Sequence, residues 1–122
     1  MSDYDKRISH RAPNLIDGVP HRGKRHNAGK PRPSLIPPTW MQELMKVMEK
    51  GAEKYDEHNW KLGMPYSEVI DSLERHLLDF KSGMDTDPDD QLSTIVKVAV
   101  NALFLRYYQI KGVGDDNRKT LG

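Results

Sequence analysis

The chain has 122 residues, which is enough for one domain at most. Only 36% of the residues are hydrophobic and 30% are charged, so a single copy has little apolar material for a core. Cysteine is absent, which excludes disulfide bonds and thiolate zinc sites. No signal peptide is recognisable, and the longest apolar run, residues 95–105, is too short to span a bilayer. We therefore expect a soluble protein of the cytoplasm.

Residues 1–33 are rich in glycine, proline and charge and have no hydrophobic period, so we expect an irregular N-terminal arm. Up to Arg32 the arm holds eight Lys or Arg and three Asp, a surplus of five positive charges, which leaves −4 for the rest of the chain. A basic arm on an acidic body is typical of proteins with a polyanionic ligand. A solvated leader without any ligand is the alternative.

Two amphipathic helices are predicted next. In the first, over residues 40–55, apolar side chains recur at helical spacing and Thr39 has the position of an N-cap. The second covers residues 66–81, because Pro65 suits the first turn of a helix and Gly83 can end one. We expect the segment between the two helices to be a loop.

A third predicted helix runs from near Asp90 to Lys111, where Gly112 stops it. It is apolar nearly all round, so it must be buried on several sides. Three helices cannot cover it alone, and we therefore predict an all-α helical bundle that a second copy completes, in a dimer or a larger homo-oligomer. Residues 34–112 then form the helical domain, and residues 113–122 form a polar tail that we expect to fray.

The first helix carries the strongest chemical signal. Glu49 and Glu53 lie four residues apart and share one helix face, so their carboxylates can hold a hard divalent cation together. Lys54, Asn59 and Trp60 follow at the end of the helix, where a cation, an amide and an aromatic ring suit a phosphate and a base. For Trp60 a packing role is the equally weighted alternative.

The third helix carries a polar stripe on an apolar background. Asp90, Thr94, Lys97 and Asn101 follow one another at steps of four, three and four residues, so they share a face. Buried polar groups are costly unless they have partners. The stripe therefore either faces solvent or lines a polar pocket.

The second helix adds further candidates. Arg75 and Asp79 are spaced for an ordinary exposed ion pair, which contributes about 0.5 kcal/mol or less, and His76 between them can be a ligand-binding or a core histidine. Asp71 and Glu74, three residues apart, add further carboxylates. Either pair on this helix can face Glu49 and Glu53 across the bundle, and the sequence does not say which.

Short motifs occur in order along the chain: Gly29-Lys30-Pro31-Arg32-x-Ser34-Leu35-Ile36-Pro37-Pro38, Gly51-Ala52-x-Lys54-Tyr55 with Asn59-Trp60, Arg75-His76-Leu77, Gly83-x-Asp85-x-Asp87-Pro88, and Asn101-Ala102 with Phe104-Leu105. This ordered set resembles the phage dATP/dGTP diphosphohydrolase family. Its members include the MazZ proteins, which are relatives of the MazG-like all-α nucleoside triphosphate pyrophosphohydrolases. The resemblance covers about residues 27–108.

The resemblance implies a metal-dependent hydrolase that converts a purine deoxynucleoside triphosphate, dGTP before dATP, to the monophosphate and pyrophosphate. It implies a place in phage 2-aminoadenine nucleotide metabolism, in the cytoplasm of the host cell. The implied cofactor is Mg²⁺ or Mn²⁺, with Glu49, Glu53, Glu74 and Asp79 as candidate ligands. Catalysis is implied for Glu49, Glu53 and Lys54. The candidate substrate-binding residues are Lys30, Arg32, Ser34, Asn59, Trp60, Arg75, His76, Lys97 and Asn101.

Two other functions compete with the hydrolase. A small nucleic-acid-binding protein would use the cations of the N-terminal arm, although few aromatic residues stand between those charges. A purely structural helical oligomer would have no use for the polar stripe of the third helix. Salt-sensitive DNA binding distinguishes the first alternative, and consumption of a nucleoside triphosphate distinguishes the hydrolase from both.

Overall fold

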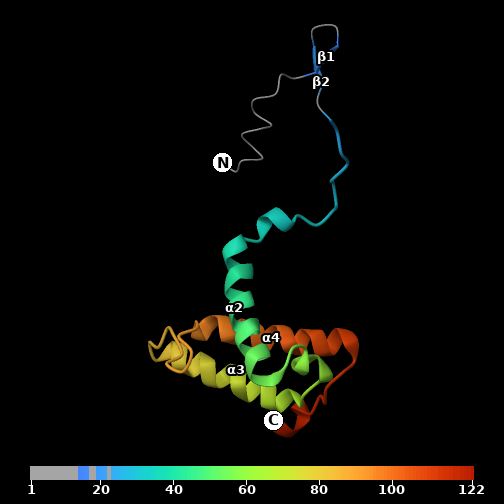
Figure 1. Ribbon diagram of the computed structural model, residues 1–122. Coiled ribbons are helices and arrows are strands. Elements are labelled where there is room, and N and C mark those ends of the chain that lie inside the picture. Colours follow the sequence, from blue (N-terminus) through green and yellow to red (C-terminus); the bar gives the residue numbers. More distant parts are fainter. Residues whose placement is uncertain (1–13, 17–18, 22) are drawn as a thin grey trace. The chain divides into compact units, whose positions relative to one another are not determined.

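The computed structural model describes residues 14–16, 19–21 and 23–122, and the chain divides into two compact units, residues 1–33 and 34–122 (Figure 1). In the first unit, strands β1 (Asn14–Ile16) and β2 (Val19–His21) pair in an antiparallel hairpin. This hairpin corrects our expectation of an irregular arm. Three-residue strands are too short to show the alternating pattern by which a strand is recognised in a sequence. The arm's cations Lys6, Arg7, Arg11 and Arg22 lie outside the described residues.

From Pro33 onward the described chain is helical, which confirms the all-α class. The elements are η1 (Pro33–Leu35), α2 (Pro38–Tyr55), η2 (Asn59–Leu62), α3 (Tyr66–Lys81), α4 (Thr94–Lys111) and η3 (Arg118–Leu121). The second predicted helix has the bounds of α3, and Gly112 ends α4 in the left-handed conformation that glycine favours. None of the helices among the described residues has the length and apolar character needed to cross a membrane.

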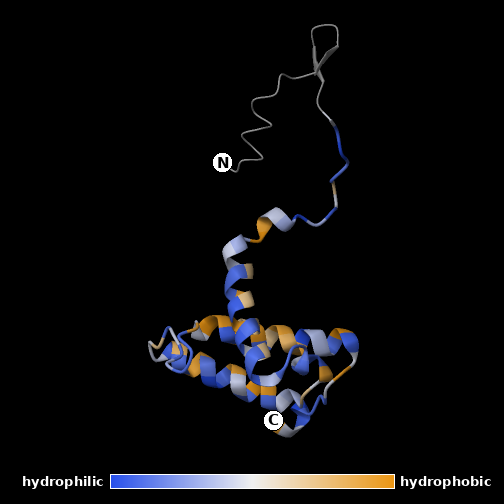
Figure 2. Cartoon of the chain, in the orientation of Figure 1, coloured by the Kyte–Doolittle hydropathy of each residue, from blue (hydrophilic) through white to orange (hydrophobic). Residues whose placement is uncertain are grey.

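Helices α3 and α4 run antiparallel and side by side, and α2 crosses them and packs against α4 (Figure 1). Apolar residues predominate on α4 except near its C-terminal end, whereas they alternate with hydrophilic residues on α3 (Figure 2). Side chains of α4 such as Ile95, Leu103 and Ile110 stay exposed in the single copy. One copy therefore leaves part of its most apolar helix uncovered.

A cluster of buried apolar residues lies where the start of α3 meets the end of α4. Tyr66, Val69 and Tyr108 form this core, and the hydroxyl of Tyr108 donates a 2.7 Å hydrogen bond to the carbonyl oxygen of Trp60. The phenol is fully buried, and burial raises the pKa of Tyr108. The hydrogen bond ties the η2 turn, which carries Trp60, to α4.

Residues 113–122, for which we expected a frayed tail, are instead attached to the start of α3. The Asn117 side chain accepts a 2.9 Å hydrogen bond from the Ser67 backbone and donates a 2.8 Å bond to the Ser67 hydroxyl. Gly114 lies so close to Gly63 that a Cβ at either glycine would collide with backbone atoms. These contacts join residues about fifty positions apart, which local polarity alone does not indicate.

The starts of two helices differ from our predictions. Helix α2 begins at Pro38, and Thr39 does not cap it, because proline with its fixed φ and missing N–H already suits the first turn. Helix α4 begins at Thr94 rather than near Asp90, since the Ser93 hydroxyl accepts the Val96 N–H at 3.2 Å as an N-cap. Gln91, with φ of 63°, cannot belong to a right-handed helix.

Candidate functional site

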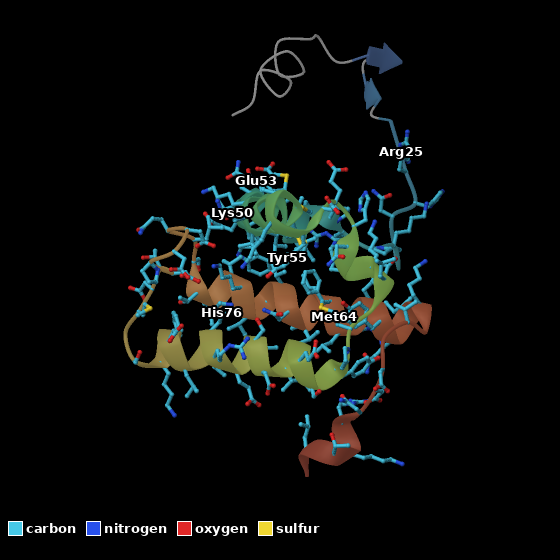
Figure 3. All side chains as sticks on the ribbon, turned by 60° about the horizontal axis from the view of Figure 1, so that its bottom comes forward. Arg25, Lys50, Glu53, Tyr55, Met64 and His76 are labelled. Atoms are coloured by element: carbon cyan, nitrogen blue, oxygen red, sulfur yellow. The ribbon has the colours of Figure 1, made fainter. Side chains whose placement is uncertain are left out.

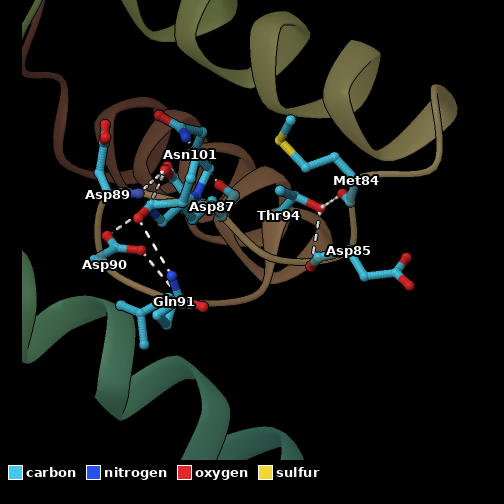
Figure 4. Close-up of polar contacts among 11 residues, drawn as sticks. Met84, Asp85, Asp87, Asp89, Asp90, Gln91, Thr94 and Asn101 are labelled. Carbon is cyan, nitrogen blue, oxygen red and sulfur yellow. Dashed lines mark hydrogen bonds and ion pairs between the residues drawn. The ribbon is translucent and has the colours of Figure 1, made fainter.

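The densest polar cluster of the second unit lies at the start of α4. The Lys97 Nζ donates to Oδ2 of Asp87 at 2.7 Å and to Oδ2 of Asp90 at 2.6 Å. Only 12% of the Lys97 side chain is exposed, against 17% for Asp87 and 13% for Asp90. We call these three residues the lysine clamp; Figure 4 labels its two aspartates, Asp87 and Asp90. The lysine clamp fastens the loop between α3 and α4 to the first turns of α4.

The protonation behaviour of the lysine clamp follows from these contacts. The hydrogen bond from Lys97 lowers the pKa of Asp87, with help from the Asp89 backbone N–H. Burial alone would raise the pKa of Asp90, but the hydrogen bonds from Lys97 and from the Leu92 N–H outweigh burial and lower it. Burial likewise opposes the charged lysine, yet its two carboxylate partners raise the pKa of Lys97. All three groups are therefore held in their charged forms.

Thr94 holds the same loop at Met84 and Asp85. Its side chain is fully buried, and its hydroxyl lies 2.8 Å from the carbonyl oxygen of Met84, to which it donates, and 3.2 Å from that of Asp85 (Figure 4). The Thr94 backbone N–H also bonds Asp85, at 3.0 Å. A buried hydroxyl with such partners is satisfied, so it is not available to a ligand.

His76 of α3 lies next to the lysine clamp. Its Nδ1 is buried and has no hydrogen-bond partner among the described residues. Burial lowers the pKa of His76, and the charge of Lys97 lowers it further, while Asp87 and Asp79 oppose that effect. His76 therefore lies near Asp79 of its own helix and also near Lys97 of α4, which comes much later in the sequence.

The charges of the lysine clamp decide what it can do. One ammonium and two carboxylates sum to −1, and two of the three N–H donors of Lys97 are already used. Such a cluster does not attract a triphosphate in this arrangement. Its geometry supports a role in holding the loop, and the phosphate contact that we predict for Lys97 would require one aspartate to move away.

The two glutamates of the first helix lie on the exposed surface of α2. Glu49 forms no ion pair with a described residue, and Glu53 lies 3.5 Å from Lys50 (Figure 3). The predicted ligands on α3 differ in exposure, since Glu74 is exposed and Asp79 is partly buried. Among residues 14–16, 19–21 and 23–122, no three His, Asp or Glu side chains gather closely enough to hold a metal ion.

The end of α2 presents an aromatic ring and a cation together. Tyr55 is 57% exposed, and the Lys54 Nζ lies 5.1 Å from the centre of its ring. Trp60 differs, because its ring stacks on Phe104 at 4.8 Å and meets the edge of Tyr107 at 4.7 Å. The structure thus gives Trp60 the packing contacts that we held as the alternative, and leaves Tyr55 as the more accessible ring.

The remaining candidates lie on several elements. Lys30 and Arg32 belong to the first unit and are exposed, as is Ser34 in η1. Asn59 and Arg75 are exposed, and the partly buried Asn101 donates its amide to the Lys97 carbonyl oxygen at 2.8 Å.

Sequence reasoning placed Lys97 in one polar stripe with its partner Asp90 but missed its second partner, Asp87. Asp87 belongs to the loop between α3 and α4, and its pairing with a lysine ten residues later depends on how that loop folds back. The run of four aspartates, of which Asp87 is one, was the available signal, since so many like charges in six residues need a nearby cation.

The sequence profile of a family described as "dATP/dGTP diphosphohydrolase, N-terminal" matches residues 20–118. A protein of Salmonella phage PMBT28, named "dATP/dGTP diphosphohydrolase", is similar to this chain, with 27% identity over 97 residues. The aligned part is 80% of this chain and 33% of that protein, so the chain spans about a third of the length of this relative. No solved structure matches the chain.

Proposed function

We propose a function from one premise: the chain belongs to the dATP/dGTP diphosphohydrolase family, since the profile of that family matches residues 20–118. In our proposal it hydrolyses a purine deoxynucleoside triphosphate to the monophosphate and pyrophosphate. The name of the phage relative, which specifies dATP and dGTP, supports this substrate class. The family match is the observation on which the proposal rests.

Three further parts of the proposal rest on the resemblance to MazZ proteins. We propose dGTP as the preferred substrate, dGMP as a precursor of 2-aminoadenine nucleotides, and the host cytoplasm as the place of action. A guanine differs from an adenine in the groups at its edge, so a polar group that hydrogen-bonds this edge can favour one of the two bases. Asn59, which is exposed and follows the end of α2 by four residues, has side-chain atoms suited to that contact.

The proposed substrate lies at the end of α2. The exposed ring of Tyr55 stacks on the purine, and the neighbouring Lys54 meets the negative charge of the phosphates. Lys30 and Arg32 are exposed in the first unit, and substrate binding by them stays a prediction from the resemblance. Lys54 lies near the C-terminal end of its helix, where the helix dipole favours a cation.

Glu49 is our proposed general base. It accepts a proton from a water molecule whose oxygen forms the new bond to the α-phosphorus, and the bond from that phosphorus to the bridging oxygen breaks. Pyrophosphate leaves with the electron pair of that bond, and the proton passes from Glu49 to solvent. The carboxylate of Glu49 is exposed and is not committed to an ion pair with a described residue, so it is free to act.

Mg²⁺ or Mn²⁺ remains part of the proposal, although the described residues of one copy do not by themselves fit a complete metal site. Glu49 and Glu53 supply two carboxylates from one helix face, and a divalent cation bound by oxygen ligands needs more. We propose that the missing ligands come from the phosphates or from a second copy. Titration of the protein with Mn²⁺, with and without a non-hydrolysable dGTP analogue, measures which of the two is needed.

A homo-oligomer is the proposed assembly. Trp40, Met41 and Met45 expose apolar surface along α2, and Leu103 and Ile110 do so on α4. Apolar residues spaced along helices in this way suit association with other helices. Sedimentation equilibrium tests the proposal: a dimer or tetramer supports it, and a monomer at micromolar concentration contradicts it.

The test of the hydrolase combines products with a matched pair of variants. Purified protein is incubated with each deoxynucleoside triphosphate and Mn²⁺ or Mg²⁺, and the products are resolved by ion-exchange chromatography. We expect pyrophosphate from dGTP, and a loss of turnover of about 10²-fold or more in Glu49→Gln. Glu43→Gln, on the same helix, should keep full activity. Absence of hydrolysis with either metal refutes the proposal, and equal activity of both variants refutes the role of Glu49.

A further inference from the structure

Residues 24–32 of the first unit, which we call the basic segment, carry more positive charge than the proposed hydrolysis uses. The segment holds Lys24, Arg25, Lys30 and Arg32, and the nearest carboxylate that follows is Glu43. All four cationic side chains are exposed, and none pairs with a carboxylate of another described residue. Cations without carboxylate partners are free to contact a polyanion.

The backbone of the basic segment separates these cations into two pairs. The Lys30 N–H donates a 3.0 Å hydrogen bond to the Asn27 carbonyl oxygen, which closes a turn. Gly29 has φ of 77° in this turn, a value at which glycine has no steric cost. Lys24 and Arg25 therefore precede the turn, and Lys30 and Arg32 follow it.

We propose that the basic segment binds the phosphate backbone of duplex DNA without reading its sequence. A duplex presents one negative charge per about 1.7 Å of its axis, so both pairs of cations can engage phosphates at the same time. A single triphosphate presents far fewer charges than a duplex. Lys24 and Arg25 have no part in the proposed hydrolysis.

The composition of the segment selects duplex DNA over a single strand. Binding of single strands depends on aromatic side chains on which the bases stack. Phe, Tyr and Trp are absent between Gly23 and Pro33, and the nearest is Trp40. Contacts to the phosphates alone position a protein on a duplex but do not specify a sequence.

The test uses the full chain, a short fluorescent duplex and fluorescence anisotropy over a range of salt concentrations. The variant Lys24→Ser with Arg25→Ser removes two charges from the segment. The control, Lys111→Ser with Lys119→Ser, removes two exposed charges from the second unit. The logarithm of the binding constant falls linearly with the logarithm of the salt concentration, and each phosphate contact makes this slope steeper by about 0.9. We therefore expect the slope of the first variant to be shallower than that of the control by about 1.8.

These outcomes test DNA binding by the basic segment independently of the proposed hydrolysis. Weaker DNA binding by the first variant, with wild-type binding by the control and unchanged dGTP hydrolysis by both, supports it. No DNA binding by the wild type at about 10⁻⁴ M protein overturns it, because non-specific binding falls between about 10⁻⁴ and 10⁻⁶ M. Equal weakening in both variants also overturns it, since net charge rather than the segment would then be responsible. Tighter binding to a single strand than to the duplex excludes the duplex backbone as the ligand.

Discussion

Replacing Lys97 by methionine tests the lysine clamp most severely. The variant Lys97→Met keeps an unbranched side chain but removes the ammonium that bonds Asp87 and Asp90. Both carboxylates are then left without their partner in a place where they are only 17% and 13% exposed. We expect the loop between α3 and α4 to loosen and the protein to lose stability.

The size of the loss follows from the burial of the three groups. Removing one partner of a fully buried ion pair costs about 3–5 kcal/mol, and exposed pairs are worth about 0–1 kcal/mol. The lysine clamp is mostly buried but retains some contact with water, so we expect Lys97→Met to lower the free energy of unfolding by about 2–3 kcal/mol. Adding Asp87→Asn and Asp90→Asn removes the unpaired charges, and this triple variant should recover at least half of the loss.

The pH dependence of the free energy of unfolding tests the same contacts independently. The folded state lowers the pKa of Asp87 and of Asp90, so their contribution to stability is complete above pH 3.8 and is lost as the pH falls through the folded values. It raises the pKa of Lys97, so that contribution is complete below pH 10.5 and is lost as the pH rises through the folded value. In Lys97→Met the burial of Asp90 is no longer outweighed by the lysine, so burial raises the pKa of that carboxyl and the unpaired charge is partly protonated at low pH. The loss of stability should therefore be larger at pH 7 than at about pH 4.5.

The assay is urea unfolding followed by far-ultraviolet circular dichroism, at both pH values, for the wild type, the single variant and the triple variant. A loss below about 0.5 kcal/mol in Lys97→Met would show that the clamp does not hold the loop, since that is the range of ordinary surface substitutions. A triple variant no more stable than the single variant would contradict the reasoning about unpaired charges.

Three further changes test other contacts by urea unfolding. Thr94→Val removes the hydroxyl that donates to the Met84 carbonyl oxygen, while Asp85 keeps the backbone N–H of residue 94; it should cost about 1–3 kcal/mol, and Thr94→Ser should keep most of the stability. Gly63→Ala should destabilise the protein more than Gly83→Ala, because φ is similar at the two glycines but only a Cβ at Gly63 meets other backbone atoms; equal effects would refute the close approach. Asn117→Ala should cost about 1 kcal/mol by removing the acceptor for the Ser67 N–H, and an unchanged midpoint would show that the tail is not attached to α3.

The helices of the second unit could be predicted because their signals are local. Pro65 and Gly83 enclose a regular apolar period, and these signals give the bounds of α3. At the start of α4 two residue types compete, since Asp90 and Ser93 are both good N-caps. Ser93 is the N-cap because Gln91, with φ of 63°, interrupts a helix that would begin at Asp90, and Asp90 instead pairs with Lys97.

The contacts that sequence reasoning missed join distant parts of the chain. Asn117 bonds Ser67 across fifty residues, and no local pattern indicates such a pair. The carboxylates of the candidate site show the same limit. Glu49 and Glu53 share a helix face, as their spacing predicts, but the spacing does not say which groups face them. That question depends on tertiary packing and on assembly.

Hydrolysis of dGTP in water enriched in ¹⁸O tests the central claim most directly. The proposed attack on the α-phosphorus places the water oxygen in dGMP and leaves the pyrophosphate unlabelled, which mass spectrometry of the two products measures. Label in the pyrophosphate would mean attack on the β-phosphorus, and release of single phosphate would mean that another bond is cleaved. Either of these results, or intact dGTP after incubation with Mg²⁺ and with Mn²⁺, contradicts the account.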